Sequence, residues 1–392
     1  MPAPTNHALV FGASGISGWA VVNALLNGYP DADTFTRVTA LTNRPLPQES
    51  SQWPPSEKFQ AIDGIDLLAG EQADLDHALK QRVPGIDTVT HVYFFAYILN
   101  MEPQQEIQAN VKILRRAVTA IQTLSPGLKF VVLPAGAKAY GIHLLDDFPF
   151  KDQVPLRESL PRIPEPFASQ LFYYPQIDLL QSLSEGKSWS YCTVMPDLVV
   201  GFVPNNNFCC LAQWLALYLS LHREISGEGA EVAFPGNPET WTVKSNDSNQ
   251  DVIARFSIYA SLHPEISAGE RFNVADSAEP STWETKWPIL CEYFGLTGVA
   301  PDGTCVDPVQ FLTENKDKWF AMEAKYGLET GRVANDRSFP YLPIGILSMM
   351  KCDRQLDSTK THAAWGKATE ELDVKQSWYT AFDRFRTARI IP

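Results

Sequence analysis

The sequence predicts an α/β protein organised around a doubly wound, Rossmann-type parallel sheet with a smaller, mostly helical C-terminal lobe. A run of four apolar residues, Ala8–Phe11, leads directly into a turn with glycine at every third position, Gly12, Gly15 and Gly18. An apolar helical run follows the turn, and a second strand pattern at 37–41 follows the helix, as a βαβ unit requires. The chain is also long enough for a large core, with 392 residues of which 45% are hydrophobic.

The glycine turn is predicted to hold the pyrophosphate of a dinucleotide. Glycine adopts backbone angles that other residues avoid, and its missing Cβ lets a phosphate approach the amides at the positive end of a helix. Ser14 and Ile16 stand between the glycines and are expected to contact the same ligand. Any tight strand-to-helix turn favours glycine, so the prediction depends on the position of this turn inside the βαβ pattern.

The remaining strands and helices continue the predicted sheet in regular order. Further strands are expected at 59–62, 88–95, 129–133 and 190–195, and helices at 73–81, 103–123 and 172–183. Residues 1–203 are therefore predicted to form the nucleotide-binding domain. Residues 204–392 are predicted to form a substrate-binding lobe, with some elements returning to the nucleotide-binding core. Helices are expected there at 211–222, 251–262, 283–294, 309–326 and 377–386.

The composition argues against several classes of partner. A formal net charge of −13 disfavours nucleic acid or an anionic membrane as a general partner. The longest apolar helical stretch, 211–221, is too short to span a bilayer, and the first residues lack the basic region of a secretory signal. The six cysteines show no CxxC spacing and the histidines no metal-ligand spacing, so we expect reduced thiols, a cytoplasmic location and no metal. A monomer and a homodimer are equally compatible with the sequence.

The residues after the second strand bear on the choice of cofactor. In this architecture an acidic residue at that place favours NAD, whereas an arginine pairs with the 2′-phosphate of NADP. The sequence has Asn43 and Arg44 there, which indicates NADPH, although an ordinary surface arginine is the alternative. Asp63, at the end of the third strand, is expected to reach the adenine amino group.

Hydride transfer to a carbonyl compound needs a group that stabilises the developing negative charge on oxygen. A tyrosine hydroxyl does this when a nearby cation lowers its pKa. Ordinary short-chain dehydrogenases use Tyr-x-x-x-Lys, which places both side chains on one helix face. That spacing is absent, since the residues four places after Tyr140, Tyr173 and Tyr174 are leucine, isoleucine and aspartate.

The chain instead has a lysine just after the fifth strand and an aromatic triplet well downstream. This arrangement resembles the progesterone 5β-reductase and iridoid synthase-like branch of the short-chain dehydrogenases. The matching motifs follow in order along nearly the whole chain: Gly12–Gly18, Asn43–Pro45, Gly136–Tyr140, Phe172–Asp178, Phe272–Asp276 and Arg389–Pro392. Together they are far more specific than the glycine triplet alone.

The resemblance implies a catalytic pair of Lys138 and Tyr173, with Tyr174 structural and Val199 among the cofactor-binding residues. Members of this family reduce the activated C=C bond of enones and enals with NADPH, so a hydrophobic small molecule is the expected substrate. The same parts would also serve a ketoreductase. A non-redox cyclase or isomerase and an NADP-sensing binding protein remain further alternatives on this fold.

The sequence departs from the family pattern mainly around the expected substrate pocket. Tyr97 replaces a pocket tryptophan, and the segment after Gly141, which contains His143, matches poorly. We expect this segment and the stretch 339–350 to shape the pocket, with Tyr97, Tyr140 and His143 among its residues. Tyr140 is also a rival hydroxyl, because residues two apart share a face if the loop after the fifth strand is extended.

Overall fold

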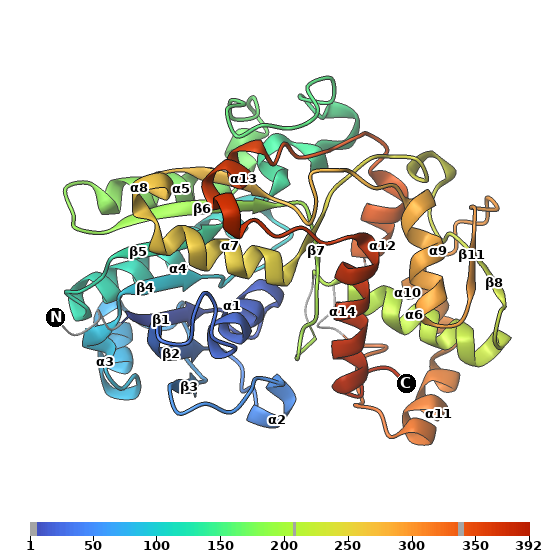
Figure 1. Cartoon of the computed structure of the whole chain (residues 1–392), viewed down its shortest axis with the longest axis horizontal. Helices are drawn as coiled ribbons and strands as arrows, with labels where there is room; N and C mark the ends of the chain where they lie inside the picture. Colours follow the sequence, from blue (N-terminus) through green and yellow to red (C-terminus); the bar gives the residue numbers. More distant parts are fainter. Residues whose placement is uncertain (1–5, 207–208, 336–340) are drawn as a thin grey trace.

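The computed structural model describes residues 6–206, 209–335 and 341–392, and its centre is a single sheet of seven parallel strands (Figure 1). The strand order is β10-β6-β5-β4-β1-β2-β3, so the predicted doubly wound sheet is confirmed. The order of connection reverses between β1 and β4, which is where sheets of this kind bind their ligands. The strands are β1 (Asn6–Phe11), β2 (Phe35–Leu41), β3 (Phe59–Ile62), β4 (His91–Phe94), β5 (Phe130–Pro134), β6 (Ser190–Pro196) and β10 (Arg271–Val274).

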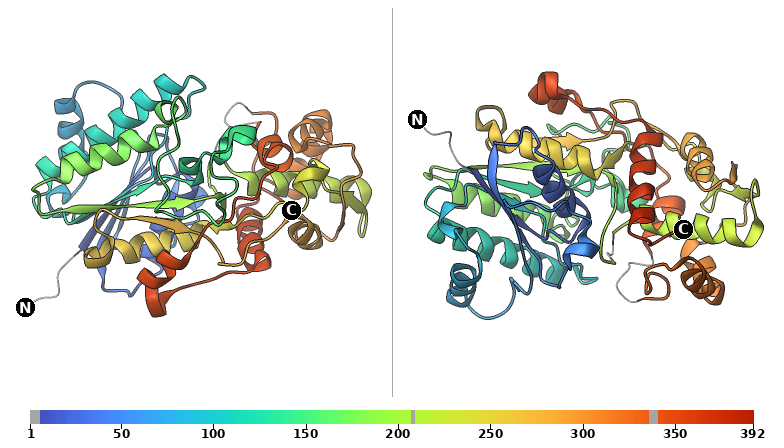
Figure 2. Two further views of the ribbon diagram at one scale, coloured as in Figure 1. Left: turned by 90° about the horizontal axis from the view of Figure 1, so that it is seen from above. Right: turned by 60° about the horizontal axis from the view of Figure 1, so that its bottom comes forward.

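Helices cover both faces of the sheet. Figure 2 shows α4 and α5 on one side of the sheet and α7 on the other. Alternate residues of β1 divide between the two cores: Ala8 and Val10 pack in the core that includes α1 and α7, whereas Leu9 and Phe11 pack in the core that includes α3, α4 and α5. These helices are α1 (Ile16–Leu26), α3 (Gln72–Arg82), α4 (Pro103–Leu124), α5 (Tyr173–Ser184) and α7 (Gln250–Leu262).

Elements from the second half of the chain also belong to the sheet layer. The edge strand β10 pairs with β6, and α13 packs against β10 and α7. The short helix α8 lies beside β6. Their bounds are α8 (Pro264–Ser267) and α13 (Thr359–Trp365).

The remaining elements form the C-terminal lobe, on the right in Figure 1. Its helices are α6 (Leu211–Ser226), α9 (Trp283–Tyr293), α10 (Pro308–Glu314), α11 (Lys316–Tyr326), α12 (Leu342–Ile344) and α14 (Val374–Thr387). Two small parallel pairs of strands complete the structure, β7 (Leu198–Val200) with β9 (Asp247–Asn249) and β8 (Glu231–Ala233) with β11 (Thr297–Val299). A short helix, α2 (Gln48–Ser51), follows β2.

One helix predicted over 309–326 is in fact two, α10 and α11, because Asn315 interrupts it. The Asn315 side chain donates to the backbone carbonyl of Phe311, and its own backbone leaves the helical region at φ −107° and ψ 21°. Asparagine competes with the helical backbone for hydrogen bonds in this way, which favours helix ends.

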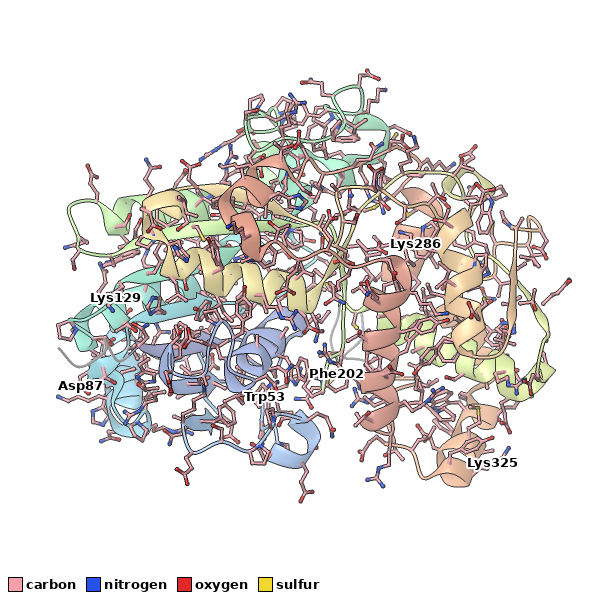
Figure 3. All side chains as sticks on the ribbon, in the orientation of Figure 1. Trp53, Asp87, Lys129, Phe202, Lys286 and Lys325 are labelled. Atoms are coloured by element: carbon pink, nitrogen blue, oxygen red, sulfur yellow. The ribbon has the colours of Figure 1, made fainter. Side chains whose placement is uncertain are left out.

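Buried polar and aromatic contacts join the lobe helices α9 and α14 to β9 and to α1. The Lys286 ammonium of α9 and the Trp378 indole of α14 both reach the carboxylate of Asp247, at 2.9 and 2.8 Å. Phe202 packs between Trp19 of α1 and Phe385 of α14; Figure 3 labels Lys286 and Phe202 at these two places. None of the helices in the described part of the chain is long and apolar enough to cross a bilayer.

Candidate active site

The glycine turn after β1 is too crowded for any larger residue. Gly12 has a φ of +72°, and a Cβ there would lie 2.5 Å from the backbone nitrogen of Ala96 just after β4. A Cβ on Gly18 would lie 2.4 Å from the carbonyl oxygen of Gly12. The first and third glycines of the motif therefore bring α1 against the turn and the turn against the end of β4.

The N-terminus of α1 is open to an anion. Gly15 is the N-cap residue, no side chain caps the helix, and its first turn carries no acidic residue. Ser14 and Ile16 flank this N-cap in the chain. Because unpaired backbone N–H groups and the helix dipole favour negative charge, the turn fits the pyrophosphate of a dinucleotide.

The polar residues expected at the adenosine end lie beyond β2 and β3. Asn43 and Arg44 are exposed, and the Arg44 guanidinium donates to the backbone carbonyl of Asn206 at 3.2 Å. Asp63 is also exposed, with its carboxylate 3.8 Å from the Arg82 guanidinium. An open groove runs between the two strand ends, and Thr42, Leu46, Ala61, Ile62, Asp63 and Arg82 line it.

Lys138 lies just beyond β5 in a 3₁₀ turn, Ala137–Tyr140, with its side chain exposed. In a 3₁₀ turn, residues two apart point in different directions, unlike the extended loop considered in the sequence analysis. Tyr140 is accordingly buried in the core, and its hydroxyl donates to the Asn273 side chain at 2.7 Å. The Tyr140 hydroxyl is thus directed away from Lys138. It lies in the packed core at the end of the sheet and not in an open pocket.

The Tyr173 hydroxyl lies at the end of the sheet between β5 and β6. A Cβ on Gly136 would be 3.2 Å from this hydroxyl and 3.3 Å from the carbonyl oxygen of Pro196, so all three groups meet at one point. Burial raises the pKa of Tyr173 above its ordinary value, and Cys209 and Glu106 act in the same direction. The phenol is therefore protonated at neutral pH. The expected lowering of its pKa by a cation is not what the structure shows.

Tyr174, the second tyrosine of the doublet, holds the backbone together. Its buried hydroxyl donates to the carbonyl of Ala139 at 2.7 Å and accepts from the backbone N–H of Ile163 at 3.0 Å. Val199 lies in β7 next to β6, half-buried and paired in register with Ser248. Tyr174 and Val199 thus lie near the carboxyl ends of β5 and β6. The Tyr174 hydroxyl already makes two hydrogen bonds within the protein.

Tyr97 is connected to Tyr173 through the ring of Phe172. Its ring stacks on Phe172 with centroids 5.3 Å apart, and Phe172 contacts the Tyr173 ring edge-on at 4.5 Å. The Tyr97 hydroxyl donates to the Glu106 carboxylate of α4 at 2.5 Å. Desolvation and this hydrogen bond raise the pKa of Tyr97. Glu106 was missed by the sequence analysis; its place in the first turn of the helix after β4 is the only signal for it.

His143 and Cys209 complete the surroundings of Lys138. Burial, and then the Lys138 charge, lower the pKa of His143 to about 4, so this imidazole is neutral at pH 7. Its Nδ1 atom is buried without a hydrogen-bond partner among the described residues. Burial raises the pKa of the Cys209 thiol, and the same lysine opposes that rise. Nothing in the sequence distinguished Cys209 from the other cysteines.

The structure thus gathers Tyr97, Lys138, His143 and Tyr173 around the carboxyl ends of β4, β5 and β6, beside the predicted nucleotide site. Of the second segment expected to shape the pocket, residues 339 and 340 lie outside the described part. No group of three or more histidine, cysteine or acidic side chains in the described ranges has the arrangement of a metal site.

Comparison with known families gives one match over nearly the whole chain. The family model described as a PRISE-like Rossmann-fold domain matches residues 8–392.

Individual relatives agree with this match. The chain is 37% identical to the short chain dehydrogenase ausT of Aspergillus calidoustus, over 98% of this chain and 94% of the relative. It is 26% identical to (S)-8-oxocitronellyl enol synthase ISY1 of Nepeta racemosa, over 100% of this chain and 95% of the relative. Among solved structures, UDP-glucuronic acid 4-epimerase from Bacillus cereus in complex with NAD has a TM-score of 0.58 at 14% identity, covering 97% of this chain and 99% of that one. This structural likeness concerns the fold alone.

Proposed function

The chain belongs to the PRISE-like Rossmann-fold family of short-chain dehydrogenases, and from this premise we propose that it is an NADPH-dependent reductase that saturates the activated C=C bond of a hydrophobic enone or enal. The observation that supports the proposal is the position of the Tyr173 hydroxyl beside Gly136, two residues before Lys138, at the carboxyl ends of β5 and β6. The Tyr173 hydroxyl is the one directed toward Gly136 and the end of β6, whereas those of Tyr140 and Tyr174 are used within the fold.

NADPH would supply the hydride. The chain has groups suited to bind each part of this cofactor. The open N-terminus of α1 would bind the pyrophosphate, and Arg44 would pair with the 2′-phosphate. Asp63, in the groove beyond β3, would accept from the adenine amino group. Val199 would line the nicotinamide end, and Lys138 would hold the adjoining ribose.

Tyr173 would act as the acid. Hydride addition at the β-carbon moves the C=C electron pair toward the carbonyl and builds negative charge on its oxygen. The neutral phenol of Tyr173 donates a hydrogen bond to that oxygen and then transfers its proton, which gives an enol that tautomerises to the saturated carbonyl compound. In the proposed complex, the exposed Lys138 ammonium would turn toward this phenolate and stabilise it by its charge. The half-buried position of the hydroxyl strengthens these interactions by excluding water.

The name of one relative supports reduction of C=C over reduction of C=O. The plant relative is by its name an enol synthase. An enol is the product expected when hydride reaches the β-carbon and a tyrosine protonates the oxygen. Direct reduction of a ketone gives an alcohol instead, so product analysis separates the two reactions.

We would test the proposal by following NADPH oxidation with enals, cyclic enones and simple ketones, and by identifying the products. Tyr173→Phe is expected to lower kcat by about a hundredfold or more, the usual loss for one oxyanion donor. Tyr174→Phe is the matched control, since it removes the neighbouring hydroxyl, and it should reduce thermal stability with a far smaller effect on kcat. Tight NADPH binding without reduction of any compound, or equal losses in both variants, would refute the proposal.

A further inference from the structure

A group of buried charged side chains lies where the C-terminal lobe meets the carboxyl edge of the sheet. It comes from the ends of β6 and β10, the start of β9, the helix α9 and the segment before α13. We call this group the junction cluster, and it consists of three carboxyl groups and two cations: Asp197, Asp247, Asp276, Lys286 and Arg354.

Two of the three carboxyl groups have a cation of their own. The Lys286 ammonium lies 2.9 Å from the Asp247 carboxylate, and the Arg354 guanidinium donates to the Asp197 carboxylate at 2.8 Å. Both cations of the cluster are therefore already paired. Asp276, the third carboxyl group, has no ion pair among the described residues.

The two carboxyl oxygens of Asp276 differ in their contacts, although the residue is only 5% exposed. Its Oδ1 accepts from the backbone N–H of Asn249, whereas its Oδ2 is buried without a hydrogen-bond partner among the described residues. The Ser377 hydroxyl of α14 lies beside this carboxyl group. A buried carboxylate in this state is costly. A proton removes the charge and turns the unpaired oxygen into a donor.

Asp276 also connects the segments that hold α14, which stands between the sheet and the rest of the lobe (Figure 1). Its backbone N–H donates to the carbonyl of Asp247 at 2.8 Å, and its carbonyl accepts from Leu372, just before α14, at 2.7 Å. The Asn249 side chain donates to the carbonyl and the hydroxyl of Ser377 in α14, both at 3.2 Å. A charge on Asp276 would therefore act on the hydrogen bonds that bind the start of α14.

We propose that Asp276 carries a proton in the folded chain and that this proton keeps α14 bound to the sheet. Three carboxylates against two cations would leave one uncompensated negative charge in a buried site, which is strongly destabilising. Loss of the proton would place that charge beside Asp247 and weaken the junction. Because β9 pairs with β7, which contains Val199, the junction also supports the proposed nicotinamide end of the site. The proposal itself does not depend on the reductase activity.

The electrostatic surroundings favour Asp276 over Asp197 as the carrier of the proton. Burial, and then the charge of Asp247, raise the pKa of Asp276 to about 7, with Lys286 among the groups that oppose the rise. Burial also raises the pKa of Asp197, but the charge and the hydrogen bond of Arg354 oppose that rise. Asp276 is therefore the carboxyl group expected to lose its proton near neutral pH.

Further charged groups near Asp276 lie at the surface. Glu371 accepts from the backbone two residues beyond Asp276 and lies 3.7 Å from the partly exposed His362. Asp373 is exposed and caps α14. Water and salt screen exposed charges of this kind, so none of these groups compensates a buried charge on Asp276.

The first test compares the natural sequence with Asp276→Asn in urea unfolding between pH 5 and 8. The amide copies the shape of the neutral carboxyl group and has no proton to lose. Between the ordinary pKa of 3.8 and about 7 the folded chain keeps the proton and the unfolded chain loses it, so Asp276 lowers stability as the pH rises. The unfolding constant of the natural sequence, divided by that of the variant, should rise about tenfold per pH unit and level off above pH 7.

Asp251→Asn is the matched control, because Asp251 also joins a helix of the sheet layer to α14 but has its own cation. Its two carboxylate oxygens accept from the Arg384 guanidinium at 3.0 and 2.7 Å. The corresponding ratio for Asp251→Asn should stay level between pH 5 and 8. A level ratio for Asp276→Asn, or the same rise for both variants, would overturn the proposal.

Infrared spectroscopy of the natural sequence labelled with ¹³C-aspartate detects the proton without relying on the stability of a variant. The folded chain at pH 6 should show the C=O stretch of a protonated aspartic acid, and this band should disappear by pH 8. No such band at pH 6, or the same band in Asp276→Asn, would refute a proton on Asp276.

Hydrogen exchange tests whether the proton acts on α14. At pH 8, peptides from Val374–Thr387 should exchange about tenfold faster in the natural sequence than in Asp276→Asn, and at pH 5.5 the two should agree within about twofold. Comparison at one pH cancels the intrinsic rate of exchange. Peptides from β1 should match at both values. Equal exchange of α14 in the two chains at pH 8 would refute the role of Asp276 at the junction, even if the infrared band is present.

Discussion

The amino edge of the central sheet, where the parallel strands begin, and the carboxyl edge, where they end, carry similar residue types. They differ in how far the polar groups there are paired by hydrogen bonds. At the amino edge the polar groups are paired with one another. The two ring nitrogens of His7 contact the hydroxyls of Thr88 and Thr39 at 3.0 and 2.9 Å, and the Lys129 ammonium donates to the Asn6 side chain at 3.0 Å. These groups complete the fold and have little left to offer a ligand.

At the carboxyl edge the corresponding groups have unused hydrogen-bonding capacity. Lys138 is exposed, the Nδ1 of His143 is buried without a partner among the described residues, and no side chain caps the N-terminus of α1. The buried Nδ1 of His143 costs free energy unless it is paired, whereas the exposed Lys138 ammonium is hydrated until a ligand reaches it. We expect these groups at the carboxyl edge to be the ones that bind ligands, and variants matched between the two edges test this expectation.

The largest effect is expected from a pair of glycines. Gly12→Ala should lower the free energy of unfolding by at least ~3 kcal/mol, because the φ of +72° is strained and the new Cβ meets immovable backbone. Gly85→Ala, at the amino edge, has a similar φ of +68°, but its Cβ meets the end of the flexible Arg37 side chain. It should cost only ~1 kcal/mol in urea unfolding. Equal costs would show that the turn after β1 has room to relax.

The second pair consists of two lysines that flank β5. Lys138→Met should lower kcat/KM for an enal about a hundredfold or more, since it removes the charge that stabilises the Tyr173 phenolate. Lys129→Met is the control at the opposite end of the strand, labelled in Figure 3, and should leave kcat/KM within about twofold of the natural sequence. A similar loss in both variants would mean that Lys138 acts through the fold and not at the site.

The elements that carry the nucleotide half of the proposed site were predictable from the sequence, because their signals are local. Gly12, Gly15 and Gly18 follow a strand and open a helix within a few residues, and Arg44 follows the next strand. A parallel sheet brings such strand ends to one edge whatever the rest of the chain does. Lys138 was predicted from the same kind of signal together with the family motif.

The substrate half was less predictable, because its residues come from separate segments whose contacts depend on packing. Nothing near Glu106 or Cys209 in the sequence indicates that they approach Tyr173. Tyr140 shows the same limit, since its side chain points into the core only because the chain forms a 3₁₀ turn there. Spacing alone could not decide between an extended loop and a turn.

The third pair consists of two arginines at opposite ends of β2. Arg44→Ala should raise the KM for NADPH by about ten- to a hundredfold, the loss of one charge-assisted hydrogen bond to phosphate, and leave the KM for NADH unchanged. Arg37→Ala should change neither KM, because its guanidinium donates to the carbonyl of Pro84 at the amino edge. Equal effects of Arg44→Ala on both cofactors would exclude Arg44 as the 2′-phosphate ligand.

The smallest effect concerns two histidines, each with a lysine nearby. Burial, and then Lys138, lower the pKa of His143 to about 4; burial, and then Lys129, lower that of His91 to about 3. Between these values and the ordinary 6.5 the unfolded chain binds more protons than the folded one. Both histidines therefore make the fold less stable as the pH falls through that window.

Lys138→Met should raise the pKa of His143 by less than one unit, because the charge removed is exposed and worth under about 1 kcal/mol. NMR titration of the imidazole signals measures this shift directly. Adding NADPH should move the His143 signals and leave those of His91 unchanged, since only the carboxyl edge is expected to bind it. A His143 that titrates near 6.5 would contradict its burial beside Lys138, and ligand-induced shifts of His91 would contradict the division of the sheet into one structural and one functional edge.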